Sequence, residues 1–138
     1  MFQNKATIYA VLSVVEIAKR RATGITTGVQ ANEVAEVYGL PTAYAAKVMS
    51  QLARSRILRS DRGPRGGFQL ARDANNISLL DVIEAVDGTI DGRLDAQQSG
   101  APADVQSGLA NVYGSATDRV REVLGSATVA KFIETHCK

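Results

Sequence analysis

Two arginines set among glycines are the residues of this sequence with the clearest chemical use. Arg62 and Arg65 stand in the run RGPRGG at 62–67, in which Gly66 follows the second arginine. Glycine lets the backbone approach a partner closely, and an arginine at the tip of such a loop can enter the narrow, negatively charged minor groove of DNA. A phosphate-binding enzyme loop is the rival interpretation, but the glycine spacing fits neither the P-loop nor the dinucleotide fingerprint. The run therefore predicts a nucleic-acid contact.

Residues for enzyme catalysis are scarce. The chain has one histidine, His136, and one cysteine, Cys137, side by side near its end. Two adjacent donors do not complete a metal site, and a frayed terminus is the commoner meaning of such a pair. No local motif groups a nucleophile with a base and an acid. The sequence therefore predicts neither an enzyme nor a metal site.

A helix over 42–55 is the expected carrier of base contacts. A short helix over 31–38 precedes it, and Gly39 and Pro41 suit a left-handed helix end and the first turn of the next helix. With an amphipathic helix over 5–21 before them, this is the layout of a helix-turn-helix unit, whose second helix enters the major groove. An ordinary solvated helix face is the alternative. The side chains expected to contact DNA are Thr42, Ala43, Tyr44, Lys47 and Ser50.

The segment after this helix predicts a β-hairpin. Two short segments with apolar residues, 57–60 and 68–71, flank the glycine-rich loop, and a hairpin that follows a helix-turn-helix unit is a wing. Basic residues around it are candidates for contacts with backbone phosphates, which would make binding weaken with salt. They are Arg54 and Arg59, with Arg56 and the more distant Lys5.

The charges divide the chain into two halves. Residues 1–72 hold eleven Lys and Arg against four acidic residues, a net charge of +7, whereas residues 73–138 hold five against ten, a net charge of −5. A basic half joined to an acidic half favours a polyanionic partner for the first, and a chance arrangement on a solvated surface is the alternative. Apolar residues make up 45% of the chain, enough for a packed core.

The second half predicts helices around a polar segment. Ser78 and Asp81 suit the start of a helix that Gly88 ends, and a long helix from about 104 to 124 follows, then a short one. Apolar residues in the long helix recur at spacings of four and three, close to the heptad seam of a coiled coil. The residues expected at this dimerisation seam are Val105, Leu109, Val112, Ala116, Val120 and Val123.

The expected fold class is mainly α with a small β-hairpin: a winged helix-turn-helix with a long C-terminal dimerisation helix. We divide the chain into a DNA-binding domain over 1–88, a flexible loop over 89–103, and a dimerisation helix with a C-terminal helix over 104–138. The apolar stretch 6–15 is too short for a bilayer, which needs about 20 residues, and lacks the order of a signal peptide. The expected location is the cytoplasm, with no membrane partner.

Several segments resemble one family of bacterial regulators. They are Tyr9-Ala10-Val11, Ala31-Asn32-Glu33-Val34-Ala35, Gly39-Leu40-Pro41, Val48-Met49-Ser50-Gln51-Leu52, the run 62–71 and the run ISLLDVIEAVDG at 77–88. Over about residues 5–88 the chain is similar to the Rrf-two family, of the IscR, NsrR and CymR type. The resemblance implies a winged-helix homodimer on near-palindromic double-stranded DNA, with the helix 42–55 in the major groove and the wing around Arg65 in the minor groove.

The sequence departs from the cluster-binding branch of that family. Members of the branch carry three cysteines before the long helix, whereas residues 89–106 hold none here. We therefore expect no cofactor and no iron–sulphur centre on that motif. A signal would come from a small-molecule or protein effector, or from Cys137. The predicted function is a sequence-specific, dimeric repressor; the alternative is a protein-interaction module on the same scaffold that binds a metabolic enzyme or another protein.

Overall fold

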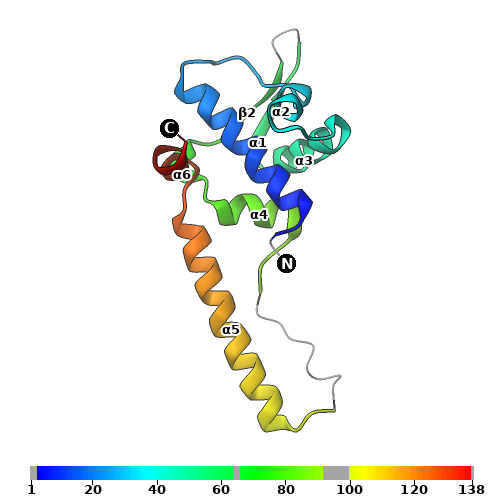
Figure 1. Cartoon of the computed structure of the whole chain (residues 1–138), viewed down its shortest axis with the longest axis vertical. Helices are drawn as coiled ribbons and strands as arrows, with labels where there is room; N and C mark the ends of the chain where they lie inside the picture. The colour runs from blue at the N-terminus through cyan, green and yellow to red at the C-terminus, as the bar shows by residue number, and fades with distance from the viewer. Residues whose placement is uncertain (1–2, 64–65, 92–99, 138) are drawn as a thin grey trace.

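Helices dominate the architecture, in line with the apolar periodicity of the sequence. The computed structural model describes residues 3–63, 66–91 and 100–137. Within these ranges the mainly α fold with one small antiparallel hairpin is confirmed (Figure 1). In chain order the elements are α1 (Lys5–Ala22), α2 (Ala31–Tyr38), α3 (Thr42–Arg54), β1 (Leu58–Asp61), β2 (Gly67–Leu70), the 3-10 helix η1 (Ala74–Asn76), α4 (Leu79–Asp87), α5 (Ala103–Ser126) and α6 (Val129–His136).

Local sequence sets most helix ends. Gly39 ends α2 in the left-handed conformation, with a φ of 66°. At the start of α4 the Ser78 hydroxyl accepts the Asp81 N–H, and the Asp81 carboxylate accepts the Ser78 N–H, both at 3.0 Å. Pro41 differs slightly from the expectation, since it stands one residue before α3 rather than in its first turn.

The core gathers around α1, against which α2, α3, α4, α6 and β2 all pack. Val14 of α1, Val34 of α2, Met49 of α3 and Val82 of α4 have no more than traces of exposed surface. Burial of one such side chain stabilises the fold by roughly 1.5–3 kcal/mol relative to leaving it in water. The orientation of α3 is therefore fixed by its buried face.

The hairpin forms the wing. Leu58 pairs with Leu70 at its base, and both side chains are buried, which anchors the two strands to the core. Val29, in the segment before α2, exchanges backbone hydrogen bonds of 2.9 and 2.8 Å with Phe68. The wing thus contacts both the segment before α2 and α3.

The end of the chain returns to the first domain. In Figure 1 α5 projects away from the other helices, while α6 lies beside α1. Val129 of α6 has 0% exposed surface within the core. Leu79 N–H donates to Ala127 O at 2.9 Å, and Val129 N–H donates to Ile77 O at 2.8 Å. The C-terminal helix, which the division by sequence placed with the dimerisation helix, thus completes the core around α1.

No helix in the described ranges combines the length and the apolar character that crossing a membrane requires.

Candidate nucleic-acid interface

One face of α3 is free of the core. The buried face carries Ala45, Val48, Met49 and Leu52. Ala43, Lys47, Ser50 and Arg54, at spacings of four, three and four, are all exposed and lie on the opposite face. Thr42 is exposed at the start of the same helix. We call Ala43, Lys47, Ser50 and Arg54 the exposed row; it runs over most of a helix about 20 Å long.

Tyr44 departs from the expectation of an exposed side chain. It is half-buried, and its ring meets that of Tyr9 edge to face, with centroids 5.1 Å apart and planes at 90°. This geometry is a favoured one for aromatic pairs. The ring of Tyr44 therefore holds the first turn of α3 against α1.

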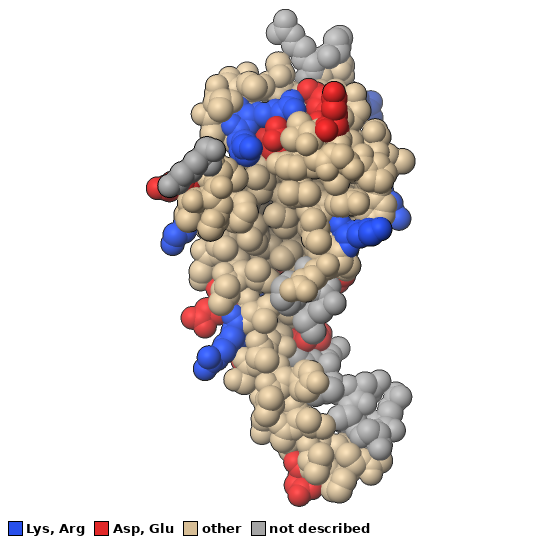
Figure 2. Space-filling model, in the orientation of Figure 1, with Lys and Arg blue, Asp and Glu red and all other residues tan. Residues whose placement is uncertain are grey.

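An ion-pair network fixes α2 on α1. The Arg20 guanidinium donates to Glu16 Oε2 and to Glu33 Oε1, both at 2.9 Å. The Gln30 N–H donates to Glu33 Oε2 at 2.6 Å. This backbone bond, together with Arg20, holds the pKa of Glu33 below its ordinary value, despite partial burial. Figure 2 shows basic and acidic groups side by side over α1 and α2.

Gln30, the residue before α2, also connects the helix-turn-helix unit to the wing. The Gln30 side chain donates from Nε2 to Gly66 O at 2.7 Å. Gly66, predicted to contact DNA, is instead buried, and a Cβ on it would collide with the backbone carbonyl of Asp61. Glycine is required at position 66 because the backbone of residues 61–63 lies too close for a side chain. Arg62 is exposed beside it, whereas Arg65 lies outside the described residues.

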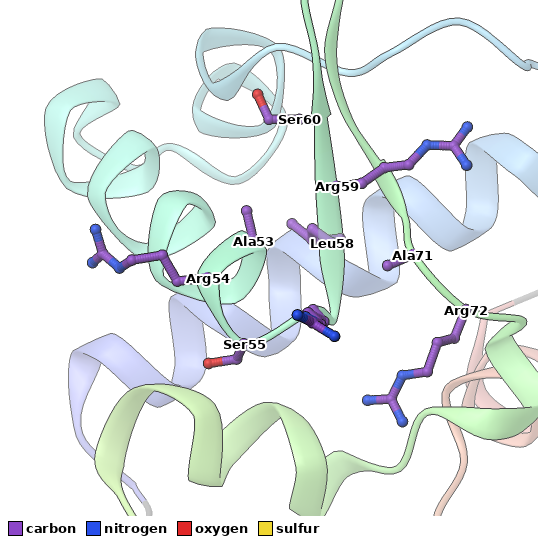
Figure 3. Close-up of a pocket in the computed structure, with 9 residues that line it drawn as sticks. Ala53, Arg54, Ser55, Leu58, Arg59, Ser60, Ala71 and Arg72 are labelled. Carbon is purple, nitrogen blue, oxygen red and sulfur yellow. The ribbon is translucent and has the colours of Figure 1, made fainter.

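A hollow of about 880 Å³ opens between the end of α3 and the hairpin. Four arginines line it, and none of its nine lining residues is acidic: Ala53, Arg54, Ser55, Arg56, Leu58, Arg59, Ser60, Ala71 and Arg72. Figure 3 shows Arg54 on one side of Leu58, with Arg59 and Arg72 on the other. We call this site the arginine hollow; its lining includes two predicted DNA contacts, Arg54 and Arg59, on opposite sides of Leu58.

Arg72 is a residue that sequence reasoning missed. Just beyond the strand pair of Leu58 and Leu70, the Ala71 N–H donates to Ile57 O at 3.0 Å, and Arg72, the next residue, lines the same hollow as Arg56. Only the hairpin register reveals this proximity. Arg59 is partly engaged within the chain: it donates to Gln69 Oε1 at 3.1 Å and lies 3.7 Å from Asp61.

The predicted seam of α5 faces solvent in the single chain. Val105, Leu109, Val112 and Val123 are between 42% and 69% exposed. Ala116 is exposed as well, and Val120 is half-buried. Tyr113, which the spacing did not include, is also half exposed at 51%. Most of α5 in the view of Figure 2 carries no charge, and these exposed hydrophobic side chains lie along it.

A helix-turn-helix unit followed directly by a hairpin defines a winged-helix DNA-binding protein. The sequence profile of the Rrf2 family, described as an iron-dependent transcriptional regulator, matches residues 3–135. The chain belongs to this family, as the resemblance indicated, and the family and the relatives are transcription regulators rather than enzymes.

Three comparisons illustrate the relationship. Rv1287 of Mycobacterium tuberculosis, provisionally named an HTH-type transcriptional regulator, is 31% identical over 123 residues, covering 88% of this chain and 74% of that protein. The HTH-type transcriptional regulator IscR of Xenorhabdus nematophila is 26% identical over 126 residues, covering 91% of this chain and 75% of that protein. The structure of CymR, the global cysteine regulator of Bacillus subtilis, superposes with a TM-score of 0.76 at 22% identity, covering 96% of this chain and 95% of that one. That last likeness shows the fold.

The family description raises the question of iron. The whole chain offers one cysteine and one histidine, so three thiolate ligands cannot be assembled from one copy. His136 instead packs its ring 5.1 Å from Phe132. No cluster of three or more His, Cys, Asp or Glu residues in the described ranges is arranged to hold a metal. The donor set does not fit a cysteine-ligated iron–sulphur cluster.

Proposed function

We propose that this protein is a dimeric, sequence-specific transcription repressor. The observation that carries the proposal is the exposed row of α3, because it presents small and basic side chains along the face turned away from the core. Helix-turn-helix proteins place the start of this helix against base edges in the major groove.

The residue types along the row suit that placement. Ala43 leaves room for close approach, and Lys47 and Ser50 can donate to guanine or to phosphate oxygens. The wing, with Arg62 and Arg65, would enter the neighbouring minor groove, where arginine is attracted by the narrow groove's negative potential. Hydrogen bonds from Gln30 to Gly66 and between Val29 and Phe68 support this arrangement, because they hold the wing at a fixed position relative to the helix-turn-helix unit.

The α5 seam supports the dimer. A row of exposed apolar side chains along a projecting helix loses contact with water when a second copy packs on it. A two-fold dimer would present two α3 helices to two half-sites of a near-palindromic operator. Each half-site would then be read by the same residues.

One cysteine and one histidine favour a regulator without an iron–sulphur cluster. The proposed place of action is the cytoplasm. Control would pass through a small-molecule or protein effector, or through Cys137. Cys137 is half-buried in the described structure.

The test is selection of genomic fragments by the purified protein at about physiological salt, where non-specific binding is weak. Enrichment of an inverted repeat supports the proposal, and fragments upstream of genes that are derepressed on deletion support a repressor. If no fragment is enriched with or without cell extract, and a protein partner co-purifies, the scaffold serves protein interaction instead.

A further inference from the structure

A small cleft lies where the end of α1, the segment between α1 and α2, and strand β2 of the wing come together. Its volume is about 100 Å³. Three apolar side chains that are only 2% or 3% exposed line it, one from each of these parts: Ile17, Val29 and Leu70. The other lining residues are Arg21, Ile25, Thr26, Thr27 and Gln69. We call this site the wing cleft; it combines a buried apolar floor with a polar rim, which is the usual make-up of a small-molecule site.

Arg21 gives the rim of the wing cleft a positive charge. It follows Ile17 by one helical turn, so both side chains lie on the same face of α1. The neighbouring Arg20 pairs with Glu16 and Glu33. By contrast, no ion pair or hydrogen bond joins the Arg21 guanidinium to another residue in the described ranges. Its charge is therefore available for an anionic group of a ligand, and a guanidinium binds a carboxylate through two parallel hydrogen bonds.

The size and the lining of the wing cleft indicate the rest of the ligand. Its volume holds an apolar group of about three or four carbon atoms, at roughly 30 Å³ for each water-sized group. Ile25 lines the cleft but is 46% exposed, and such a group would remove part of this side chain from water. None of the eight described lining residues is acidic, so nothing there matches the ammonium of an amino acid. Together these features favour a short, branched aliphatic carboxylate.

Hydrogen bonds join the wing cleft to the hairpin. Gln69 of β2 donates from Nε2 to Thr26 O at 2.9 Å. The Phe68 N–H donates to Val29 O at 2.8 Å. Residues 21–27 are all exposed, and a segment with so few buried contacts is among the parts of a protein that open most easily. A ligand held between α1 and this segment would restrain the segment and, through those two bonds, would also restrain the wing.

We propose that the wing cleft binds a short, branched aliphatic carboxylate, with the carboxylate on Arg21 and the hydrocarbon over the buried floor, and that this ligand raises the affinity for operator DNA. The second part rests on the proposed function, in which the wing contacts DNA. A wing that the ligand already restrains loses less conformational entropy when it binds DNA. By linkage, operator DNA must raise the affinity for the ligand by the same factor. The ligand would act as a co-repressor.

The experiment measures the binding of isovalerate to the full-length protein, by ligand-observed NMR and by the shift in melting temperature. A dissociation constant of about 0.1–1 mM is expected for a ligand this small. Two further compounds divide the molecule into its parts. Isopentanol has the same hydrocarbon without the charge, and acetate has the charge with little hydrocarbon. Each should bind at least about tenfold more weakly than isovalerate.

Two variants test the position of the carboxylate. Arg21→Gln should weaken isovalerate binding about tenfold or more, because it removes a charge-assisted pair of hydrogen bonds. Its melting temperature without ligand should stay close to that of the wild type, since Arg21 is exposed and its side chain has no partner within the described ranges. Lys19→Gln is the matched control. It removes one exposed positive charge from the other face of the same helix and should bind isovalerate like the wild type.

Operator affinity tests the regulatory part of the proposal. With saturating isovalerate it should rise about fivefold or more in the wild type and in Lys19→Gln, but stay unchanged in Arg21→Gln. An operator affinity that is unchanged or lowered when isovalerate binds to the wild type overturns the co-repressor role.

The remaining outcomes separate the wing cleft from the proposed function. Lack of saturable isovalerate binding, or binding that Arg21→Gln does not weaken, overturns the proposal even if the wild type selects its operator. A wild type without operator preference overturns the proposed function, while isovalerate binding still decides whether the cleft is a ligand site. If Arg21→Gln lowers DNA affinity and its salt dependence while isovalerate does not bind, Arg21 is a phosphate contact and the ligand assignment is overturned.

Discussion

Arg121 of α5 and Glu84 of α4 form an ion pair, with Arg121 Nη1 2.5 Å from Glu84 Oε2. The same carboxylate oxygen accepts the Ile90 N–H at 2.6 Å, and Arg121 Nη1 also donates to Ile90 O at 2.9 Å. Three segments therefore meet at one carboxylate: α4, the residues that follow it, and the second half of α5. The pair helps to set the direction in which α5 leaves the domain.

Glu84→Gln should lower the free energy of unfolding by about 1 kcal/mol. A hydrogen bond to a charged group is worth roughly 1.5–3 kcal/mol, and the value is discounted because the Arg121 and Glu84 side chains are 37% and 21% exposed. Urea denaturation of Glu84→Gln, Arg121→Gln and the double variant measures the coupling. Strictly additive losses in the double variant would contradict the coupling between Glu84 and Arg121.

The single variants should also tolerate operators with altered half-site spacing, because the ion pair no longer fixes the orientation of α5.

The Tyr9–Tyr44 pair predicts that Tyr44 acts through its ring. Tyr44→Ala should destabilise the fold, with a coupling to Tyr9→Ala of about 0.5–1.5 kcal/mol, the usual worth of an aromatic pair beyond its buried area. Tyr44→Phe keeps the ring and should leave stability nearly unchanged. Operator affinity of Tyr44→Phe then tests the contact predicted from sequence: a clear loss would assign the Tyr44 hydroxyl to DNA, and an unchanged value would leave only the positioning role.

Features set by neighbours in the chain were predictable from sequence. Gly39 ends α2 and the Ser78–Asp81 pair starts α4 because both depend on a few adjacent residues. The α5 spacing likewise predicted its helix, since a periodic pattern over many residues is a strong signal.

Features that depend on the tertiary register were not predictable. Arg72 lines the arginine hollow only through the pairing of the two hairpin strands, and a shift of one residue in that pairing would turn its side chain to the other face. A glycine in the wing can allow close approach either to DNA or to the protein's own backbone. Gly66 is buried against residues 61–63, which favours the second explanation. Val129 enters the core only because α6 returns to α1.

Glu33 predicts a pH dependence of stability. Because the Gln30 N–H and Arg20 lower the pKa of Glu33 in the folded state, its carboxylate stabilises the fold above the ordinary pKa of 4.5. This contribution is lost as the pH falls below 4.5 and through the lowered folded pKa. Unfolding by urea at pH 7 and pH 3 should therefore show a smaller difference between wild type and Glu33→Gln at the lower pH. A difference that stays constant would contradict the assignment.

Gly66→Ala should damage the base of the wing. The added Cβ would meet the Asp61 carbonyl, and lie 2.9 Å from Gly63 O, so the hairpin must shift. Forced overpacking of this kind costs typically 1–3 kcal/mol, and the Gln30 bond to Gly66 O would be disturbed with it. Thermal denaturation measures the loss. Gly24→Ala is a suitable comparison, because Gly24 has positive φ but open space around it, so only backbone strain applies there.

Leu109→Glu should separate the dimer without unfolding the chain. Leu109 is 42% exposed in the single chain, so the substitution leaves the core intact, whereas a partner helix packed on it would have to bury a carboxylate. Sedimentation should show a dissociation constant raised at least tenfold, with an unchanged helical spectrum.

Ser107→Glu is the matched control for the seam. Ser107 is exposed two residues away, and a rotation of about 200° places it on the opposite face of α5, away from the seam. It should remain dimeric. Operator binding by Leu109→Glu should become weak and lose its dependence on two half-sites, because a monomer reads one half-site only. A dimer that survives Leu109→Glu and fails with Ser107→Glu would place the interface on the other face of α5.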